Sequence, residues 1–184
     1  MKIQERVPPS SWVRRFAPLI PHGGTVLDLA CGDGRHARLL AMLGYCVEAV
    51  DRNAEALVNL AGVPRITTRA ADLEGGAWPY AADRFDGIVV TNYLYRPRLA
   101  HLNRALRPGG ILIYETFMVG NELVGKPSNP EFLLRPGELL DVIRPTLTVV
   151  AFEQGQVDMP GPAWIQRICA IAGEVPLLPT WNPS

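Results

Sequence analysis

Short apolar runs alternate with helix-forming stretches along most of the chain. The runs that predict buried strands are Thr25–Cys31, Cys46–Arg52, Ile66–Asp72, Phe85–Asn92 and Ile111–Phe117. Helices are predicted over Arg35–Leu43 and Ala54–Ala61, from Pro97 onward, and over Pro136–Ile143. This alternation is typical of a parallel sheet with helices on both faces. We therefore expect an α/β fold of three layers.

The last two apolar runs depart from this alternation. Leu147–Glu153 and Trp164–Ala172 are separated by a loop alone. Consecutive strands without a crossover helix pair antiparallel if they pair at all. The predicted sheet is therefore seven-stranded, mostly parallel, and closed at its end by an antiparallel hairpin. The sequence RPGG at Arg107–Gly110 is expected to break the chain before its neighbouring strand.

Length and composition fit a single domain over residues 1–184. The chain is 48% hydrophobic and 20% charged, which is ordinary for a globular protein. No apolar run approaches the ~20 residues of a membrane span, and the first residues lack the apolar run of a signal peptide. The 18 basic and 18 acidic residues balance. This balance disfavours membranes and nucleic acid as partners, and it leaves a local basic patch open.

The cysteines predict the compartment. Cys31, Cys46 and Cys169 are odd in number and far apart, and each lies in an apolar run. We expect buried free thiols in a reducing compartment, and hence a cytoplasmic location. No two cysteines have a zinc-binding spacing and the three histidines are scattered, so no metal site is expected.

Two glycines lie in the turn between the first predicted strand and the first predicted helix. Gly32 and Gly34 let the backbone turn tightly and approach a ligand that a Cβ would block. The helix that follows offers free N–H groups, and open α/β sheets bind ligands at this edge. A purely structural turn can need both glycines as well, so the pair alone is a weak signal.

Acidic residues close the next two strands. Asp51 lies where a carboxylate can accept hydrogen bonds from both hydroxyls of a ribose. Asp72 lies where a carboxylate can reach an adenine amino group, and the backbone of Leu73 can reach the ring. Each aspartate has a simpler alternative, as a helix cap or a solvated strand end.

These residues fit two kinds of cofactor. The segment Gly32–Ala37 also satisfies the alanine-ending dinucleotide fingerprint, with Asp51 at the expected distance. Asp28, however, would face the pyrophosphate of a dinucleotide, whereas its charge suits a cationic ligand. The terminal antiparallel hairpin is also foreign to the dinucleotide pattern. An NAD-dependent oxidoreductase stays an alternative, although the chain has no Tyr-x-x-x-Lys pair.

The motifs in their order carry a more specific resemblance. VLDLACGDGRHARLLA, EAVDRN, AADL, FDGIVVTNYL and LRPGGILIYETF resemble the motif series of class I S-adenosylmethionine-dependent methyltransferases, over Thr25–Ala172. The subgroup they resemble most comprises small bacterial proteins of the tellurite-resistance and general methyltransferase-domain type. The resemblance implies a Rossmann-like three-layer sandwich, with S-adenosylmethionine as cofactor.

Two positions depart from common family patterns. Ala30 stands where many members have a first glycine, and alanine is a tolerated variant there. Asn92-Tyr-Leu-Tyr95 is not the Asn-Pro-Pro-Tyr motif of enzymes that methylate the amino groups of adenine or glutamine. That chemistry is therefore not supported.

The resemblance also assigns cofactor contacts. Those implied around the methionine portion are Asp28, Ala30, Gly32 and Gly34. Those implied around the ribose and adenine are Asp51, Arg52, Asp72 and Leu73. Asn92 is implied beside the transferable methyl group.

The acceptor side is less determined. Asn92, Tyr95 and Glu115 are the candidate catalytic residues, and His36 is open to a surface, cofactor-side or general-base role. Residues 1–22 are expected to form an N-terminal cap. Met118–Arg135 is long for a connection in an α/β fold and predicts a lid without regular structure.

We expect a small-molecule acceptor and make no prediction of the oligomeric state. The alternatives are a methyltransferase acting on tRNA or protein, and a module that binds S-adenosylmethionine without catalysis.

Overall fold

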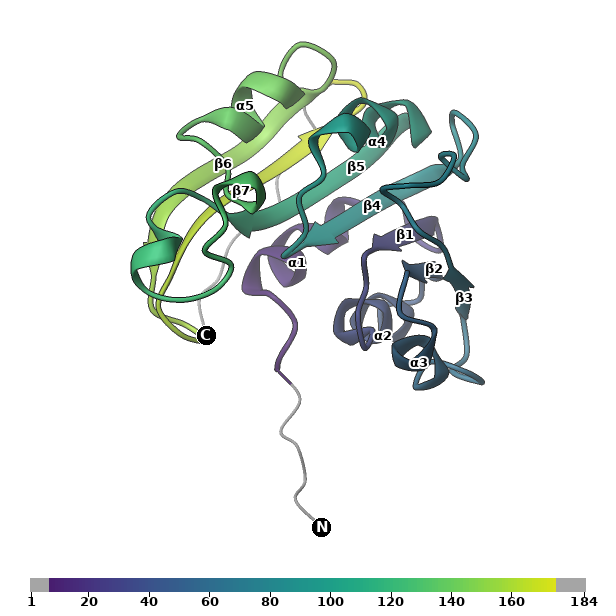
Figure 1. Cartoon of the computed structure of the whole chain (residues 1–184). Helices are drawn as coiled ribbons and strands as arrows, with labels where there is room; N and C mark the ends of the chain where they lie inside the picture. The colour runs from purple at the N-terminus through teal and green to yellow at the C-terminus, as the bar shows by residue number, and fades with distance from the viewer. Residues whose placement is uncertain (1–6, 175–184) are drawn as a thin grey trace.

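The computed structural model describes residues 7–174, and its centre is a seven-stranded sheet of order β3-β2-β1-β4-β5-β7-β6 (Figure 1). Its strands are β1 (Thr25–Leu29), β2 (Cys46–Asp51), β3 (Ile66–Ala70), β4 (Phe85–Thr91), β5 (Leu106–Phe117), β6 (Thr148–Val157) and β7 (Ala163–Ile171). The first five run parallel, and β7 pairs antiparallel with β5 and β6. The predicted fold class, a mostly parallel sheet that ends in an antiparallel hairpin, is confirmed.

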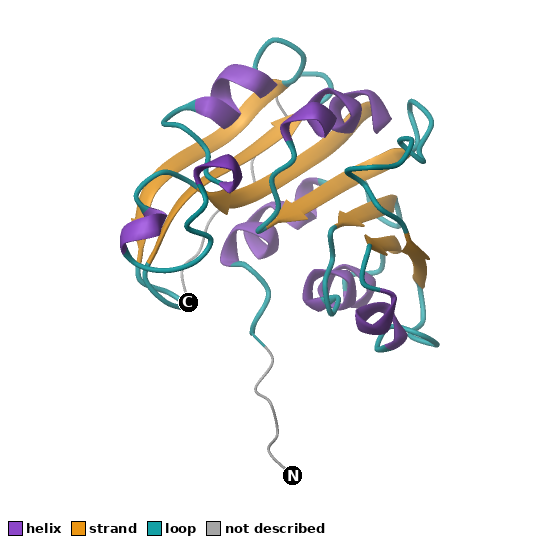
Figure 2. Cartoon of the chain, viewed as in Figure 1, coloured by secondary structure: helices purple, strands orange, loops and turns teal. Residues whose placement is uncertain are grey.

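Helices cover both faces of the sheet (Figure 2). On one face lie α1 (Ser11–Phe16), α2 (Arg35–Met42) and α3 (Ala54–Val58), and on the other lie α4 (Leu99–Ala105) and α5 (Glu138–Ile143). Each face has its own apolar cluster: Trp12, Leu40 and Leu57 belong to one, and Leu102 and Leu139 to the other. Within residues 7–174, no helix has the length and apolar composition needed to cross a membrane.

The RPGG sequence does not break the chain as predicted. Arg107–Gly110 lies inside β5, because Leu106 already pairs with Phe85 of β4. The register between these strands then shifts, and Gly109 adopts a φ of 80°. An irregularity in the ladder therefore absorbs the extra residues, and glycine permits it without steric strain.

The terminal hairpin is longer than predicted. β6 runs to Val157, four residues beyond Glu153, since the polar segment from Gln154 continues to pair with β7. Backbone pairing satisfies N–H and C=O groups whatever the side chains are, so the ladder outlasts the apolar run. Residues 157–163, here called the hairpin tip, thereby lie beyond Phe117, the last paired residue of β5.

The thiol prediction holds for two of the three cysteines. Cys31 and Cys169 are buried and free, whereas Cys46 is free and exposed. Cys46 is the first residue of β2 and is exposed, whereas the next four residues of the strand are buried. Of the predicted N-terminal cap, residues 1–6 lie outside the described residues.

Candidate functional site

The turn after β1 is held in an unusual backbone conformation. Ala30, Gly32 and Gly34 all have positive φ, at 54°, 55° and 78°. The Asp51 carboxylate supports the turn from the end of β2, because its Oδ2 accepts the Gly32 N–H at 2.8 Å. Its Oδ1 accepts the N–H of Asn53 at 2.9 Å. One carboxylate therefore fixes the two strand ends relative to each other.

The two glycines of this turn serve different ends. A Cβ at Gly32 would meet no atom within 4 Å, so this position borders open space. A Cβ at Gly34 would lie 2.5 Å from the side chain of Leu60 in the core. The space needed by a Cβ at Gly34 is therefore taken up by a core side chain, while the contact of the Gly34 backbone with the cofactor stays a prediction.

Asp28 is buried beneath this turn with an unsatisfied oxygen. Its side chain is 1% exposed, and Oδ2 has no hydrogen-bond partner among the described residues. Burial raises the pKa of Asp28 to about 7, against the opposing effects of a hydrogen bond from the Ala37 backbone and the charge of Arg35. A buried carboxylate oxygen without a partner suits a cationic donor, since pairing would offset the cost of its desolvation.

A cavity of about 230 Å³ opens where the parallel strands end, and we call it the strand-end cavity. Its lining follows β1, β2, β3 and β4 and consists of Ala30, Asp51, Arg52, Ala71, Asp72, Leu73, Glu74, Asn92 and Tyr93. Most residues predicted to contact the cofactor are thus brought together here. Tyr93, Ala71 and Glu74 were not predicted as cofactor contacts; each directly adjoins a residue that was.

Asp72 accepts hydrogen bonds from the turn that follows it, in addition to lining the cavity. Its Oδ1 accepts the N–H of Glu74 at 3.0 Å. Backbone hydrogen bonds from Glu74 and Gly75 lower the pKa of this exposed carboxyl. Asp72 therefore stabilises its own turn as an anion while it lines the cavity.

A second cavity, of about 470 Å³, lies on the other side of Asn92. It is lined by residues 7–11, here called the strap, and by most of the hairpin tip, and we call it the strap cavity. Its remaining lining residues are Arg35, Asn92, Glu115, Phe117, Ile165 and Arg167. Arg35 and Arg167 were not predicted, because their distance in the chain gives no sign that they meet.

Asn92 is the residue that the two cavities share. It follows β4 with a φ of 55°, a conformation that asparagine tolerates better than most residues. Its backbone N–H donates to the carbonyl of Glu115 at 2.9 Å. A ligand group at Asn92 would therefore be within reach of molecules in either cavity.

The other two candidate catalytic residues have partners of their own. Glu115 lines the strap cavity and forms an ion pair with Arg167 at 3.5 Å. Arg167 also pairs with Glu153 at 2.6 Å. Tyr95 lines neither cavity, and its hydroxyl donates to the carbonyl of Glu74 at 3.1 Å.

His36 joins the strap to the cavity walls. It is 1% exposed, and its Nε2 accepts the Ser10 N–H at 3.0 Å. Because an N–H can only donate, the imidazole proton lies on Nδ1, 3.2 Å from the Thr91 hydroxyl. Burial, with the charges of Arg35 and Arg14, lowers the pKa of His36 to about 3. His36 is therefore a buried, uncharged residue that connects the strap to Thr91 of β4. It is neither a surface residue nor a free base.

The predicted lid, residues 118–135, has more structure than expected. It contains two short 3-10 helices, Asn121–Leu123 and Pro130–Phe132. A bridge between Met118 and Leu134 closes its base, and the side chain of Leu134 is buried. None of its residues lines the strand-end cavity or the strap cavity.

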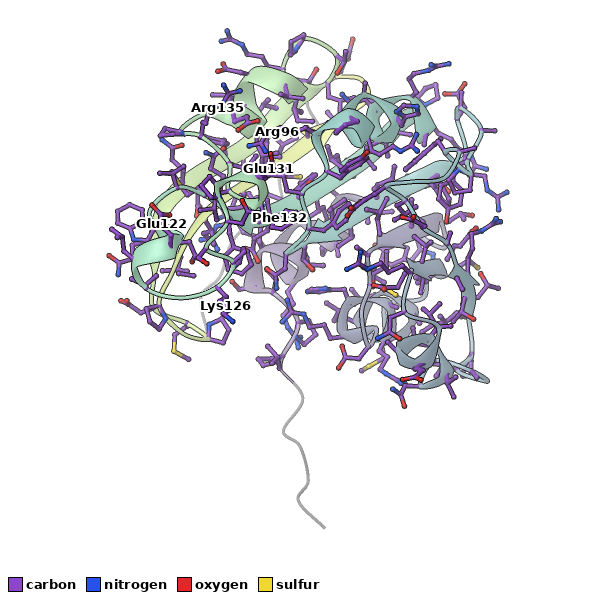
Figure 3. The ribbon with its side chains drawn as sticks, viewed as in Figure 1. Arg96, Glu122, Lys126, Glu131, Phe132 and Arg135 are labelled. Carbon is purple, nitrogen blue, oxygen red and sulfur yellow. The ribbon has the colours of Figure 1, made fainter. Side chains whose placement is uncertain are left out.

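Arg96 fastens this loop to the body of the protein. Its guanidinium donates to the carbonyls of Glu131 and Leu133 at 2.7 and 2.8 Å and pairs with Glu138 at 2.6 Å. Burial would raise the pKa of Glu138, but hydrogen bonds from Arg96 and the Arg135 backbone lower it to about 2. Arg96 and Arg135 lie at one end of the loop, away from Glu122 and Lys126 (Figure 3).

Comparisons with known proteins agree with this geometry. A model of the methyltransferase domain family matches residues 1–130. A tRNA U34 carboxymethyltransferase of Hahella chejuensis is 33% identical over 119 residues, which are 59% of this chain and 37% of that protein. A protein-L-isoaspartate O-methyltransferase of Chlorobaculum tepidum is 35% identical over 106 residues, 54% of this chain and 47% of that protein.

The chain thus spans less than half the length of these two relatives. Among solved structures, TehB from Haemophilus influenzae superposes with a TM-score of 0.74 at 21% identity. That match covers 89% of this chain and 62% of TehB. At this identity the likeness concerns the fold alone.

Proposed function

Because the chain belongs to the methyltransferase domain family, as its motif series predicted, we propose that it transfers the methyl group of S-adenosylmethionine to a small-molecule acceptor. The observation that carries this proposal is the position of Asn92 between two cavities of different character. The strand-end cavity is proposed for the adenosine portion of the cofactor. The strap cavity is proposed for the acceptor.

The residues around the first cavity fit this cofactor. Asp28 offers a buried, unpartnered carboxylate oxygen to the cationic amino group of the methionine portion. Gly32 leaves open space at the turn, and Asp51, which lines the cavity, is proposed to accept hydrogen bonds from the ribose hydroxyls. Arg52, Asp72 and the Leu73 backbone are proposed to border the adenine.

The chain would act mainly by alignment and by exclusion of water. The bound cofactor supplies a methyl group on a sulfonium, which reacts by in-line displacement. Asn92 would orient the two reactants at their meeting point, and the strap and hairpin tip would keep water from them. Glu115 would hold Arg167 in place at the wall of the acceptor site. For Tyr95 we propose a supporting role at the Glu74 turn.

An acceptor in tRNA or protein is the second candidate, because the two relatives described above carry such names. The volume of the strap cavity, about 470 Å³, favours the small molecule, since it is the size of a typical small-ligand pocket. The balance of 18 basic and 18 acidic residues also supplies no general attraction to RNA. The free thiols support the proposed cytoplasmic location.

Two measurements test this function. Calorimetry with S-adenosylhomocysteine and NAD in parallel should give binding of the first alone. Labelled S-adenosylmethionine should then transfer its methyl group into a metabolite extract, and not into bulk tRNA or cell protein. Label in the macromolecular fractions alone would assign the second candidate, and binding without any transfer would indicate a non-catalytic module.

A further inference from the structure

We propose that the acceptor is a small organic acid with an apolar body, bound through its carboxylate to Arg35 and methylated on a carboxylate oxygen. This inference rests on the proposed function, because it places the acceptor in the strap cavity. It adds the chemical class of the acceptor, the residue that would recognise it, and the atom that receives the methyl group.

The lining of the strap cavity is mostly apolar. Apolar side chains line it from the strap, β5, the hairpin tip and β7: Val7, Pro8, Pro9, Phe117, Met159, Pro160, Pro162 and Ile165. Such a lining gains free energy from burying hydrocarbon and gives nothing to an extended polar or multiply charged molecule. The body of the acceptor should therefore be apolar.

One of the two arginines that line this cavity forms no ion pair with the described residues. Arg167 is paired with Glu115 and Glu153, so its charge is met by protein carboxylates. Among residues 7–174 no carboxylate lies within ion-pair distance of Arg35, whose guanidinium donates to the Pro8 carbonyl at 3.4 Å. An anionic group on the acceptor would complete the hydrogen bonding of Arg35, as guanidinium and carboxylate match in geometry.

The cavity also has no free base for an acceptor that must lose a proton. Glu115, the carboxylate in its described lining, is ion-paired with Arg167. Both nitrogens of the nearby His36 are engaged, with the Ser10 N–H and the Thr91 hydroxyl. A nucleophile that is already an anion at neutral pH needs no base. A carboxylate meets this condition, whereas an alcohol does not and an amine is protonated.

The proposed transfer balances without a co-reactant. A carboxylate oxygen forms a bond to the methyl carbon while the bond from that carbon to sulfur breaks. The sulfur keeps the electron pair and leaves as the neutral thioether S-adenosylhomocysteine. The acid becomes a methyl ester, the opposite charges cancel, and no proton is taken up or released. Cancellation of charge is favoured in a covered, apolar cavity.

The test uses acids with matched alcohols and amines as probes. Octanoate and 3-phenylpropanoate should bind the enzyme–S-adenosylhomocysteine complex in calorimetry and yield labelled methyl esters from labelled S-adenosylmethionine. The alcohols and amines of the same carbon skeletons should do neither. Arg35→Met should weaken octanoate binding by about 10- to 100-fold, the range expected for a hydrogen bond to a charged group. Arg35→Lys should lose less.

Arg14→Met is the matched control, since Arg14 is an exposed arginine nearby that lines neither cavity. It should leave octanoate binding unchanged. In Arg35→Met the loss of octanoate affinity should exceed any loss of S-adenosylhomocysteine affinity, which can change because the charge of Arg35 lowers the pKa of Asp28. Methylation of the alcohols or amines, or no binding of either acid, would overturn the inference. So would a loss confined to S-adenosylhomocysteine in Arg35→Met, because Arg35 would then hold the cofactor. A wild type that binds no S-adenosylhomocysteine would instead contradict the proposed function itself.

Discussion

The strand-end cavity is built from parallel strand ends and the turns directly after them, whereas the strap cavity is built from segments far apart in the chain. In the first, the Asp51 carboxylate holds the turn at Gly32 through a backbone N–H, beside backbone hydrogen bonds of Cys31 and Gly34. In the second, the strap depends on long-range ties, such as Ser10 to His36 and the Trp12 indole to the Ile168 carbonyl at 3.2 Å.

This difference has a consequence for how each side responds to change. The strand-end cavity shares its backbone with the sheet, so damage there should reach the fold as well as the ligand. The strap cavity is covered by parts that a few side chains fasten to the sheet. Changes there should alter the acceptor and the strap while the sheet persists.

The largest effect should come from the glycines of the β1 turn. Gly34→Ala combines a left-handed φ of 78° with a Cβ that overlaps Leu60, so it should lower the free energy of unfolding by about 2–5 kcal/mol. Gly32→Ala has a similar φ but open space around its Cβ, and about 1–2 kcal/mol is expected. Urea unfolding measures both, and equal losses would contradict the separate roles assigned to the two glycines.

Substitutions of Asp51 test whether the residue that holds the β1 turn also binds the cofactor at the strand-end cavity. Asp51→Ala removes the acceptor of the Gly32 N–H and should weaken S-adenosylhomocysteine binding by about 1.5–3 kcal/mol in calorimetry. Asp51→Asn keeps one carbonyl oxygen and should lose less. A folded Asp51→Ala protein with unchanged affinity would remove Asp51 from the cofactor site.

His36 tests the attachment of the strap through pH. Its pKa is lowered to about 3 in the folded protein from 6.5, so the unfolded chain takes up the proton first as the pH falls. This contribution is fully present above pH 6.5 and is lost toward pH 3. At pH 5 the part lost through His36 should be about 2 kcal/mol of unfolding free energy relative to pH 7. Asp28 acts in the opposite direction, because its folded pKa is raised to about 7 and its protonation therefore stabilises the folded protein as the pH falls.

Urea unfolding of the wild type and of His36→Gln at the two pH values isolates this loss. On going from pH 7 to pH 5, the unfolding free energy of the wild type should fall by about 2 kcal/mol relative to that of His36→Gln, because glutamine does not titrate in this range. His22→Gln is the control, since His22 is exposed and this variant should follow the wild type. Equal changes in the wild type and in His36→Gln would show that His36 contributes no pH dependence.

The same contrast explains what could be predicted from the sequence. Asp51 and Leu73 were predicted to share one binding site because they lie at or just after strand ends, and parallel strands end at one edge; in the structure both line the strand-end cavity. Local pattern was sufficient there. It was insufficient for Gly34, because the overlap with Leu60 depends on how α2 and the segment after α3 pack.

The acceptor side escaped prediction for a physical reason. The strap cavity needs Ser10, Arg35 and Arg167 to meet, and no local periodicity carries such contacts. The hairpin tip was missed because the predicted strand stopped at Glu153 with the apolar run, whereas the pairing with β7 continues from Gln154 to Val157. Loop 118–135 was the longest connection and drew the lid prediction, but buried Leu134 and the bonds from Arg96 anchor it elsewhere.

The smallest effect we expect is the release of a fraction of a proton from Asp28 when the cofactor binds. Its pKa of about 7 leaves the buried carboxyl about half protonated at pH 7 in the free protein. A cationic amino group placed against the unpartnered Oδ2 should lower that pKa, so binding should release about half a proton. Calorimetry of S-adenosylhomocysteine binding in phosphate and in Tris, whose ionisation enthalpies differ, measures the release.

The release should also depend on this one side chain. Asp28→Asn keeps the shape of the side chain but cannot titrate, and it should abolish the release at pH 7. Release that persists in this variant would assign the proton to another group. No release from the wild type would mean that the cofactor leaves Asp28 unpaired, which would weaken the argument that this buried oxygen is a binding group.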